Sequence, residues 1–308
     1  MFVFIILLAL LITTIILQSL VYIVWQSIFF TSLVFQFILL LFSIISLFIK
    51  RNKQIIITSI ISIILSISLI IPNCVLTFNI DAKENIKFVA HAGGSLENHT
   101  YTNSQESFLN CINNNINLIE LDFLYTADKQ IVCSHEFENI GDFNLTNRPT
   151  IMEYKNSKIY SLYNGITFDW LILQLKENPN IKIVFDTKEE DAVALLANMI
   201  EISKTQDFDI FNRFIIQVYS IENYNALQVF NFAEYWFTNY KAEYSISKIN
   251  EYFEDKENVT TIVLYYNTWM LYRSFGFKTK KEVAVHTLSK QIDIDFVSKR
   301  GVDIIYID

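Results

Sequence analysis

Residues 118–123 read Leu-Ile-Glu-Leu-Asp-Phe, and this stretch contains the pattern that decides how the chain folds. Alternate side chains of a β-strand point to the same face, so Glu120 and Asp122 share one face and their apolar neighbours share the other. So many apolar neighbours indicate that the strand is buried. A buried strand with two carboxylates on one face is the starting point for the rest of the chain.

Seven further apolar runs resemble this one in length, and amphipathic helical patterns separate them. The predicted strands cover residues 87–91, 118–123, 181–186, 214–219, 235–238, 261–266, 283–286 and 303–307, and the predicted helices cover 104–114, 168–177, 192–204, 222–232, 246–254 and 289–299. Eight strands that alternate with helices fit a (β/α)8, or TIM, barrel. A doubly wound open sheet shows the same alternation and is the competing architecture.

The positions of the polar residues favour the barrel. Polar or ionisable side chains gather at the carboxyl ends of the predicted strands: His91, Glu120, Asp122, Asp186, Gln217 and His286. In a barrel these ends share one mouth, where catalytic groups lie. We therefore predict that residues 80–308 form an α/β domain of the TIM-barrel class.

The chain before residue 80 is too apolar for a soluble domain. The whole chain is 52% hydrophobic and 18% charged, and residues 1–49 contain no Asp, Glu, Lys, Arg or His. No basic start or small-residue cleavage site indicates a cleaved signal peptide. Because a helix needs about 20 apolar residues to cross a bilayer, residues 1–79 are predicted to form an α-helical transmembrane anchor of about three helices. These spans lie near 2–24, 29–48 and 55–78, with two crossings and one interfacial helix as the alternative.

The only charges in this anchor are Lys50, Arg51 and Lys53, between the second and third predicted spans. Short basic loops stay cytoplasmic, so the domain after the anchor is predicted to lie outside the cell membrane. The whole chain has a net charge of −8 and the anchor contributes +3, so residues 80–308 carry −11. Nucleic-acid phosphates are bound by clustered Lys and Arg, so such an acidic domain is not expected to bind nucleic acid.

The carboxylate pair suggests a metal site. Glu120 and Asp122 lie on one face of a strand, where each raises the pKa of the other unless a cation lies between them. A hard divalent ion such as Mg²⁺ or Ca²⁺ is the natural occupant, with a solvated strand edge as the alternative. Asp186 and Lys188 repeat the same spacing with one acid and one base. Asp186 could therefore complete a three-carboxylate site, and Lys188 could contact a phosphate.

Two histidines flank the carboxylate pair in the sequence. His91 ends a predicted strand and is followed by Gly93 and Gly94, which give flexible backbone that a ligand can approach closely. His135 follows a turn and a short predicted strand at 130–134, which returns it toward the mouth. Taken singly each histidine is weak evidence, but their joint occurrence around two carboxylates indicates a site.

Together these motifs resemble the glycerophosphodiester phosphodiesterase family, which is related in fold and mechanism to the phosphatidylinositol-specific phospholipases C. That family shows His-Arg-Gly, Asn-Thr, Glu-x-Asp, Thr-x-Asp, His-Asp and Glu-x-Lys, in this order. The chain has, in the same order, His91-Ala92-Gly93, Asn103-Ser104, Glu120-Leu121-Asp122, Thr126-Ala127-Asp128, His135-Glu136 and Asp186-Thr187-Lys188. The resemblance runs from about Lys87 to Asp308, because residues 301–308 resemble the family's closing barrel strand.

The resemblance implies a phosphoric diester hydrolase built on a TIM barrel, with a small insertion near residues 137–165. It implies one divalent cation, Mg²⁺ or Ca²⁺, and a two-histidine mechanism. The roles that it implies are general acid and base for His91 and His135, metal binding for Glu120, Asp122 and Asp186, and phosphate contact for Lys188. His286 and Trp269, near predicted strand ends, are further candidates for substrate binding, with ordinary packing as the alternative.

The chain departs from the family pattern at three of these positions. Ala92 replaces the arginine, Asp186 is one methylene shorter than the glutamate, and Glu136 replaces the aspartate. The first change removes a bidentate phosphate clamp, for which Arg148 and Arg213 are candidate substitutes.

We therefore expect a membrane-anchored, metal-dependent phosphodiesterase that hydrolyses a glycerophosphodiester or a phospholipid headgroup. A glycerol-phosphate polymer of the cell envelope suits the anchor equally well as a substrate. The alternative function is a catalytically weak barrel that binds phospholipid or glycerol-phosphate polymer headgroups. The expected partners are the phosphodiester and the membrane.

Overall fold

The computed structural model describes residues 81–83, 85–137, 139–240, 244–274, 276 and 278–308, with isolated positions at 57, 60, 61, 63, 64 and 67. The chain divides into two compact units, one of residues 1–80 with 269–278 and one of residues 81–268 with 279–308. Apart from those isolated positions, the predicted membrane spans at 2–24, 29–48 and 55–78 lie outside the described residues. Among the helices that are described, none combines the length and the apolar character that a membrane crossing requires.

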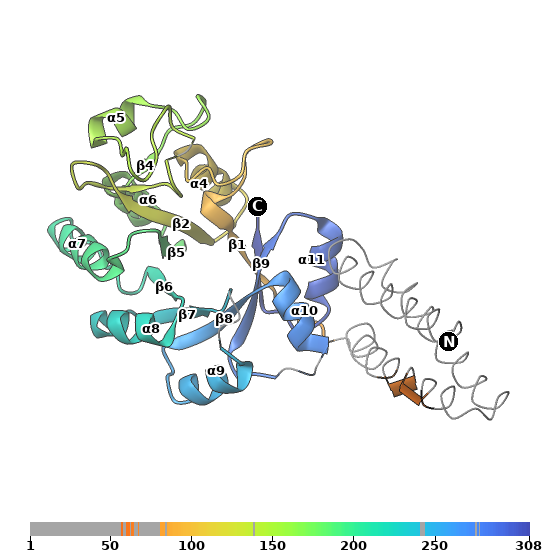
Figure 1. The fold of residues 1–308 in the computed structure, drawn as a ribbon. Coiled ribbons are helices and arrows are strands. Elements are labelled where there is room, and N and C mark those ends of the chain that lie inside the picture. The colour runs from red at the N-terminus through yellow and green to blue at the C-terminus, as the bar shows by residue number, and fades with distance from the viewer. Residues whose placement is uncertain are drawn as a thin grey trace. The chain divides into compact units, whose positions relative to one another are not determined.

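Eight parallel strands close into a barrel in the unit of residues 81–268 and 279–308 (Figure 1). They are β1 (Lys87–Ala90), β2 (Leu118–Tyr125), β5 (Lys182–Thr187), β6 (Phe214–Val218), β7 (Glu234–Thr238), β8 (Val259–Tyr265), β9 (Glu282–Leu288) and β10 (Ile304–Ile307). Strand β1 pairs in parallel with both β10 and β2, and this double pairing closes the ring. The predicted TIM barrel is thus confirmed, and the open sheet is excluded because the strand order has no free edge between β1 and β2.

Helices connect these strands along the chain. They are α4 (Gln105–Asn113), α6 (Phe168–Glu177), α7 (Ala192–Thr205), α8 (Ile221–Leu227), α9 (Ile246–Phe253), α10 (Tyr266–Ser274) and α11 (Gln291–Ser298), with the 3₁₀ turns η1 (His91–Gly93) and η2 (Gln228–Phe230). Most begin at a side-chain cap; for example, Ser104 and Ser220 each accept a backbone N–H of the first turn. Figure 1 shows α7, α8 and α9 on the outside of the strands. Helix α10 was not among the predicted helices.

The inside of the barrel is filled by apolar side chains from its strands. The buried cluster contains Val89, Val184, Ile215, Trp236, Val263, Ala284, Ile304 and Tyr306, and Leu118 packs against it. Glu120 and Asp122 lie two and four residues after Leu118 on β2, so all three share one face of that strand. The inward face of β2 therefore changes from packing residue to carboxylate as the strand approaches the mouth.

The predicted insertion lies between two short strands, β3 (Ile131–Cys133) and β4 (Ile166–Thr167). Strand β3 pairs antiparallel with the last residues of β2, and β4 pairs antiparallel with β3. The segment contains helix α5 (Ile151–Asn156) and has its own apolar cluster around Phe137 and Tyr154. The buried Tyr154 hydroxyl donates a 2.6 Å hydrogen bond to the carbonyl of Cys133, which fixes the insertion to the sheet.

Arg213 holds the opposite, amino-terminal end of the barrel together. It immediately precedes β6, and its guanidinium donates hydrogen bonds of 2.7–3.0 Å to the backbone carbonyls of Leu175, Asn178 and Ile181. These carbonyls lie at the end of α6 and in the connection to β5, and burial lowers the pKa of the Arg213 side chain. Because the strands run away from this end toward the mouth, Arg213 is not the substitute phosphate clamp that the sequence suggested.

Replacing Arg213 with methionine should lower the free energy of unfolding by about 2–4 kcal/mol, because three backbone carbonyls lose their donor at about 1 kcal/mol or more each. Urea unfolding followed by tryptophan fluorescence measures this change. Lys204→Met, which removes an exposed charge from α7, is the control and should stay within about 0.5 kcal/mol of the wild type. Equal losses in the two variants would contradict the structural role of Arg213.

Candidate active site

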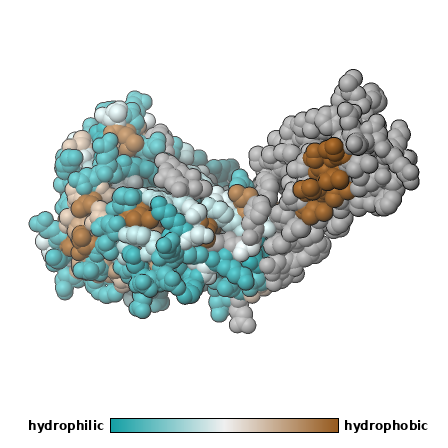
Figure 2. Space-filling model, turned by 60° about the horizontal axis from the view of Figure 1, so that its bottom comes forward, coloured by the Kyte–Doolittle hydropathy of each residue, from teal (hydrophilic) through white to brown (hydrophobic). Residues whose placement is uncertain are grey.

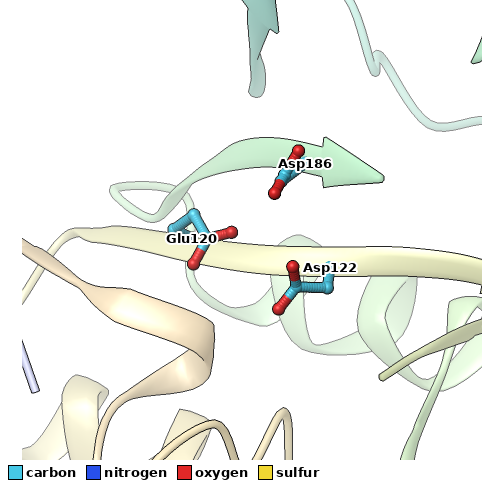
Figure 3. Close-up of side chains that lie close together, drawn as sticks. All are labelled: Glu120, Asp122 and Asp186. Atoms are coloured by element: carbon cyan, nitrogen blue, oxygen red, sulfur yellow. The ribbon is translucent and has the colours of Figure 1, made fainter. Parts of the chain in front are cut away.

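Three carboxylates meet inside the mouth of the barrel. Glu120 and Asp122 project from β2 and Asp186 from the adjacent β5, and the two strands are in register so that Asp122 lies opposite Asp186. One oxygen of each side chain lies within 4.8 Å of one oxygen of both others, and all three residues are buried. Figure 3 shows the three side chains pointing toward one another across the two strands. The sequence predicted this cluster, and the structure brings its members together.

Neutral donors from the β1–α4 connection orient two of these carboxylates. The backbone N–H of Ala92 donates to Glu120 Oε2 at 2.5 Å. The Asn103 side-chain amide donates to Asp122 Oδ2 at 2.9 Å, and its oxygen accepts the Asp122 backbone N–H at 3.0 Å. Ala92 and Asn103 both have positive φ angles, +47° and +43°, which non-glycine residues rarely adopt. Backbone strain of this kind is concentrated at functional sites, where the surrounding contacts maintain it.

Asp186 is held by three different donors. Its Oδ1 accepts the Thr187 backbone N–H at 2.7 Å and the Tyr219 hydroxyl at 2.5 Å, and its Oδ2 contacts Lys188 Nζ at 2.9 Å. The Lys188 ammonium also lies 3.8 Å from Asp122. Burial acts to lower the pKa of Lys188, but the charges of Asp186 and Asp122 outweigh it and raise that pKa. Lys188 therefore stays charged beside the carboxylates.

The electrostatics of the cluster fit a divalent cation. Burial is the main cause that raises the pKa of Glu120, followed by the charges of Asp122 and Asp186; burial and Asp186 raise the pKa of Asp122. With all groups ionised, three carboxylates and one ammonium leave two negative charges in a buried space. Carboxylate oxygens are the ligands that Mg²⁺ and Ca²⁺ prefer, and an ion of charge +2 would balance the excess. Glu120, Asp122 and Asp186 are thus the residues that could hold such an ion.

His91 lies at the end of β1 and is part of an ordered pair. Its Nδ1 is hydrogen-bonded to Asp308 Oδ1 at 2.7 Å, and Asp308 Oδ2 accepts the Ser289 hydroxyl at 3.1 Å. Burial acts to raise the pKa of Asp308, but the hydrogen bond and charge of His91 outweigh it and lower that pKa. The Asp308 carboxylate is therefore ionised and can support a positive imidazole. We did not predict Asp308, although it follows β10 directly, as His91 follows β1 and Lys188 follows β5.

His135 follows β3 and faces the same mouth. Its Nδ1 lies 3.7 Å from Glu136 Oε1, and its side chain is 26% exposed, compared with 7% for His91. Its charge partly opposes the rise in the pKa of Asp122, which burial and the charge of Asp186 keep above its ordinary value. Between the two histidines lies Tyr101, whose ring contacts both imidazoles edge-on with centroid distances of 4.6 Å to His91 and 5.1 Å to His135.

His286 lies near the carboxyl end of β9, beside His91, and packs among aromatic side chains. The two imidazole centroids are 4.5 Å apart, and the Tyr240 and Tyr306 rings lie at 4.7 and 4.9 Å from His286. Burial, and then the charges of His91 and Lys188, lower the pKa of His286 to about 2. His286 is therefore a neutral imidazole at any working pH and cannot share acid–base duty with His91.

A cavity of about 510 Å³ opens beside the carboxylates. Its lining includes Asp186, Lys188 and three tyrosines, Tyr219, Tyr240 and Tyr265. Tyr240 and Tyr265 stack with their ring centroids 4.3 Å apart and an angle of 18° between the planes. The cavity joins charged groups to an aromatic wall that also offers hydroxyl and amide groups.

Two further predicted candidates have different outcomes. Trp269 lies in α10, among the residues that belong to the other compact unit, and its role in substrate binding stays a prediction. Arg148 is engaged elsewhere, because its guanidinium pairs with Glu189 and donates to the backbone carbonyls of Tyr125 and Leu145. Arg148 ties the insertion to the loop after β5, so it is committed to structure.

The carboxylate cluster predicts how the stability of the protein depends on pH and on added metal. A carboxyl whose pKa is raised by folding binds protons more tightly in the folded chain, so the stability of the metal-free protein falls as pH rises above the ordinary value of 4.5. Adding Mg²⁺ or Ca²⁺ should raise the melting temperature, and more so at pH 8 than at pH 5. At a concentration of about 100 times Kd the gain is about 2.7 kcal/mol. Thermal unfolding with each ion and with chelator measures it.

Glu120→Gln keeps the size of the side chain and removes one charge from the cluster. At pH 8 this variant should be more stable than the wild type without metal, and it should gain little from added metal. Glu201→Gln removes an exposed carboxylate from α7 and is the matched control, which should respond to metal as the wild type does. A full metal response in the Glu120 variant would contradict the assignment.

Comparisons with known proteins come from structure alone, since no protein-family model and no curated protein matches the sequence. A glycerophosphodiester phosphodiesterase from Parabacteroides distasonis is similar with a TM-score of 0.58 and 20% identity, over 73% of this chain and 94% of that one. One from Thermotoga maritima has a TM-score of 0.52 and 20% identity, over 73% and 95% of the two chains. An Oleispira antarctica phosphodiesterase, solved in complex with the product sn-glycerol-3-phosphate, has a TM-score of 0.58 and 12% identity, over 72% and 92%. The chain therefore has the TIM-barrel fold that these phosphodiesterases share.

Proposed function

We propose that the chain is a metal-dependent phosphodiesterase of the glycerophosphodiester phosphodiesterase type, anchored in the membrane by residues 1–79. The observation that carries the proposal is the buried cluster of Glu120, Asp122 and Asp186 with Lys188 in the mouth of the barrel, where His91 and His135 also lie on either side of Tyr101. The sequence motifs and the fold shared with known phosphodiesterases support the same reading.

The residues are suited to the electrostatic problem of the reaction. A phosphodiester is an anion, and more negative charge develops on its non-bridging oxygens as the nucleophile attacks. A divalent cation held by the carboxylates would supply positive charge there. Lys188 adds a fixed ammonium whose pKa is raised, so it can contact the phosphate in its charged form over the whole working range.

The two histidines are suited to move the protons. One imidazole takes the proton of the attacking hydroxyl, either of water or of a neighbouring alcohol of the substrate, and the other gives a proton to the leaving alkoxide. The Asp308 carboxylate fixes the tautomer of His91 by bonding its Nδ1, which leaves Nε2 as the atom that exchanges protons. The proton count balances, because one histidine gains a proton and the other loses one in each transfer step.

The alcohol part of the substrate fits the cavity beside the cluster. Asp186 and Lys188 line this cavity together with the stacked pair of Tyr240 and Tyr265. A glycerol, a phospholipid headgroup or a unit of a glycerol-phosphate polymer offers hydroxyls for the polar wall groups and a small carbon frame for the aromatic faces.

The membrane part of the proposal rests on the sequence and on six described positions. All of them, at 57, 60, 61, 63, 64 and 67, are helical isoleucines, and five are 42–60% exposed. Figure 2 shows a hydrophobic patch, in brown, in this part of the chain. Isoleucine exposed in this way is unfavourable in water and favourable against lipid. With the basic turn at Lys50–Lys53 in the cytoplasm, the barrel would act at the extracytoplasmic face of the cell membrane.

The alternative is a barrel that binds phosphorylated headgroups but turns them over slowly. Ala92 favours it, because the residue beside the first histidine has no guanidinium for the phosphate. The intact histidine and carboxylate sets favour catalysis.

Full-length protein should release alcohol from at least one member of a panel of phosphodiesters, such as glycerophosphodiesters, phospholipids and glycerol-phosphate polymer. The release should stop after thorough chelation and return when Mg²⁺ or Ca²⁺ is added back. The reason is that the negative charge on the reacting phosphate is stabilised by a cation bound at the carboxylates. Product analysis of each reaction measures it. Activity that survives chelation would contradict the assignment of the three carboxylates as a metal site. Binding of a headgroup without release of alcohol would favour the alternative function.

His91→Ala and His135→Ala should each lower kcat by about 100-fold or more, since each removes a proton-transfer group. Asp308→Asn should lower kcat by a smaller factor, because it disturbs the orientation and charge of His91 and leaves the imidazole in place. Lys204→Met serves as control and should keep wild-type activity. Unchanged turnover in the His91 variant would contradict the mechanism.

A further inference from the structure

We propose that the phenol hydroxyl of Tyr101 donates a hydrogen bond to a phosphate oxygen of the substrate, which lies between His91 and His135. This inference rests on the proposed function, because it names a further substrate contact in the same site. It also concerns a position for which the sequence motifs give no role.

The first support is the position of the ring. The centroid of the Tyr101 ring lies 4.6 Å from that of His91, with an interplanar angle of 77°. It lies 5.1 Å from the centroid of His135, with an angle of 72°. The phosphorus atom must lie between the group that takes a proton and the group that gives one, so the ring of Tyr101 borders the place where the phosphate reacts.

The second support is the hydroxyl. Within the described part of the chain the Tyr101 hydroxyl makes no hydrogen bond, and the residue is exposed, so the hydroxyl is accessible to a ligand. Burial first, and then the nearby charges of Asp308, Asp122 and Glu120, raise the pKa of the phenol. Glu120 and Asp122 lie on the inward face of β2 and Asp308 directly follows β10, so these charges place Tyr101 at the mouth, as its ring contacts with His91 and His135 do. A phenol that keeps its proton there offers a donor to an anion.

The third support is that the surrounding backbone fixes Tyr101. Tyr101 has a φ of +54°, a conformation that a large L-residue keeps only when its neighbours impose it. The Thr100 carbonyl accepts the Tyr160 hydroxyl of the insertion at 3.2 Å, and the Thr102 hydroxyl donates to the Gly94 carbonyl at 3.1 Å. The Asn103 N–H bonds the Ala92 carbonyl at 2.8 Å. The ring is therefore held in the mouth by contacts on both sides of it in sequence.

The chemistry explains how the site can work with Ala92. Ala92 is completely buried and uses its backbone N–H to hold Glu120, so it contributes no donor to a ligand. Tyr101 supplies one neutral donor from the same β1–α4 connection. A neutral donor suits this place, because Lys188 and the histidine that gives a proton already bring positive charge to a single anionic group.

The test is Tyr101→Phe, which keeps the ring between the histidines and removes only the donor. With the divalent cation present, the affinity for inorganic phosphate should fall about 10- to 100-fold, which is the value of one hydrogen bond to a charged group. The kcat/KM for the best phosphodiester should fall by a similar factor. The melting temperature and its rise on metal addition should equal those of the wild type.

Tyr252→Phe is the matched control, because the Tyr252 hydroxyl bonds Asn225 at 2.8 Å on the outside of the barrel, in α9 and α8. It should keep wild-type phosphate affinity and turnover. Wild-type phosphate affinity in the Tyr101 variant overturns the proposal, as does faster turnover, which would make Tyr101 an obstruction. Phosphate titration decides the question even if no phosphodiester is hydrolysed, so failure of this inference is distinct from failure of the proposed function.

Discussion

The structure depends on one constraint, which is that the inward face of β2 must both fill the barrel and carry charge. Leu118 packs against the apolar cluster, while Glu120 and Asp122, further along the same face, lie beside a third carboxylate. Repulsion between buried like charges opposes folding, and the barrel tolerates it only where donors converge. The β1–α4 connection supplies such donors to Glu120 and Asp122, and the last residue of β5 and the residue after β6 supply them to Asp186. The unusual backbone of the mouth follows from this need.

The sequence predicted the barrel well, because each element carries its own local signal. The eight strands lie within a few residues of the predicted ranges, since buried parallel strands are short apolar runs and most helices start at a capping side chain. The three carboxylates were also predictable, since same-face spacing and strand ends are properties of single segments. Helix α10 was missed because its exposed face and its tyrosines blur the apolar period.

The rest of the site could not be predicted, because it consists of contacts between segments far apart in the chain. Asp308 and His91 are 217 residues apart, and only closure of the barrel between β1 and β10 brings them together. Tyr101 sits in a loop without a strand or helix period, so nothing local indicates that its ring enters the mouth. The role of Arg213 is likewise visible only once the ends of the barrel are known, since the same side chain could serve an anion or three carbonyls.

The insertion has a consequence beyond its own packing. One of its tyrosines, Tyr160, bonds the loop that carries Tyr101, and its Arg148 pairs with Glu189, the residue after Lys188. The insertion thus bridges the proton-transfer side of the mouth and the cationic side. Because one segment contacts both sides, a substitution that displaced this rim would be expected to affect both. Selection on substrate size could act through this bridge, leaving the carboxylates and histidines themselves untouched.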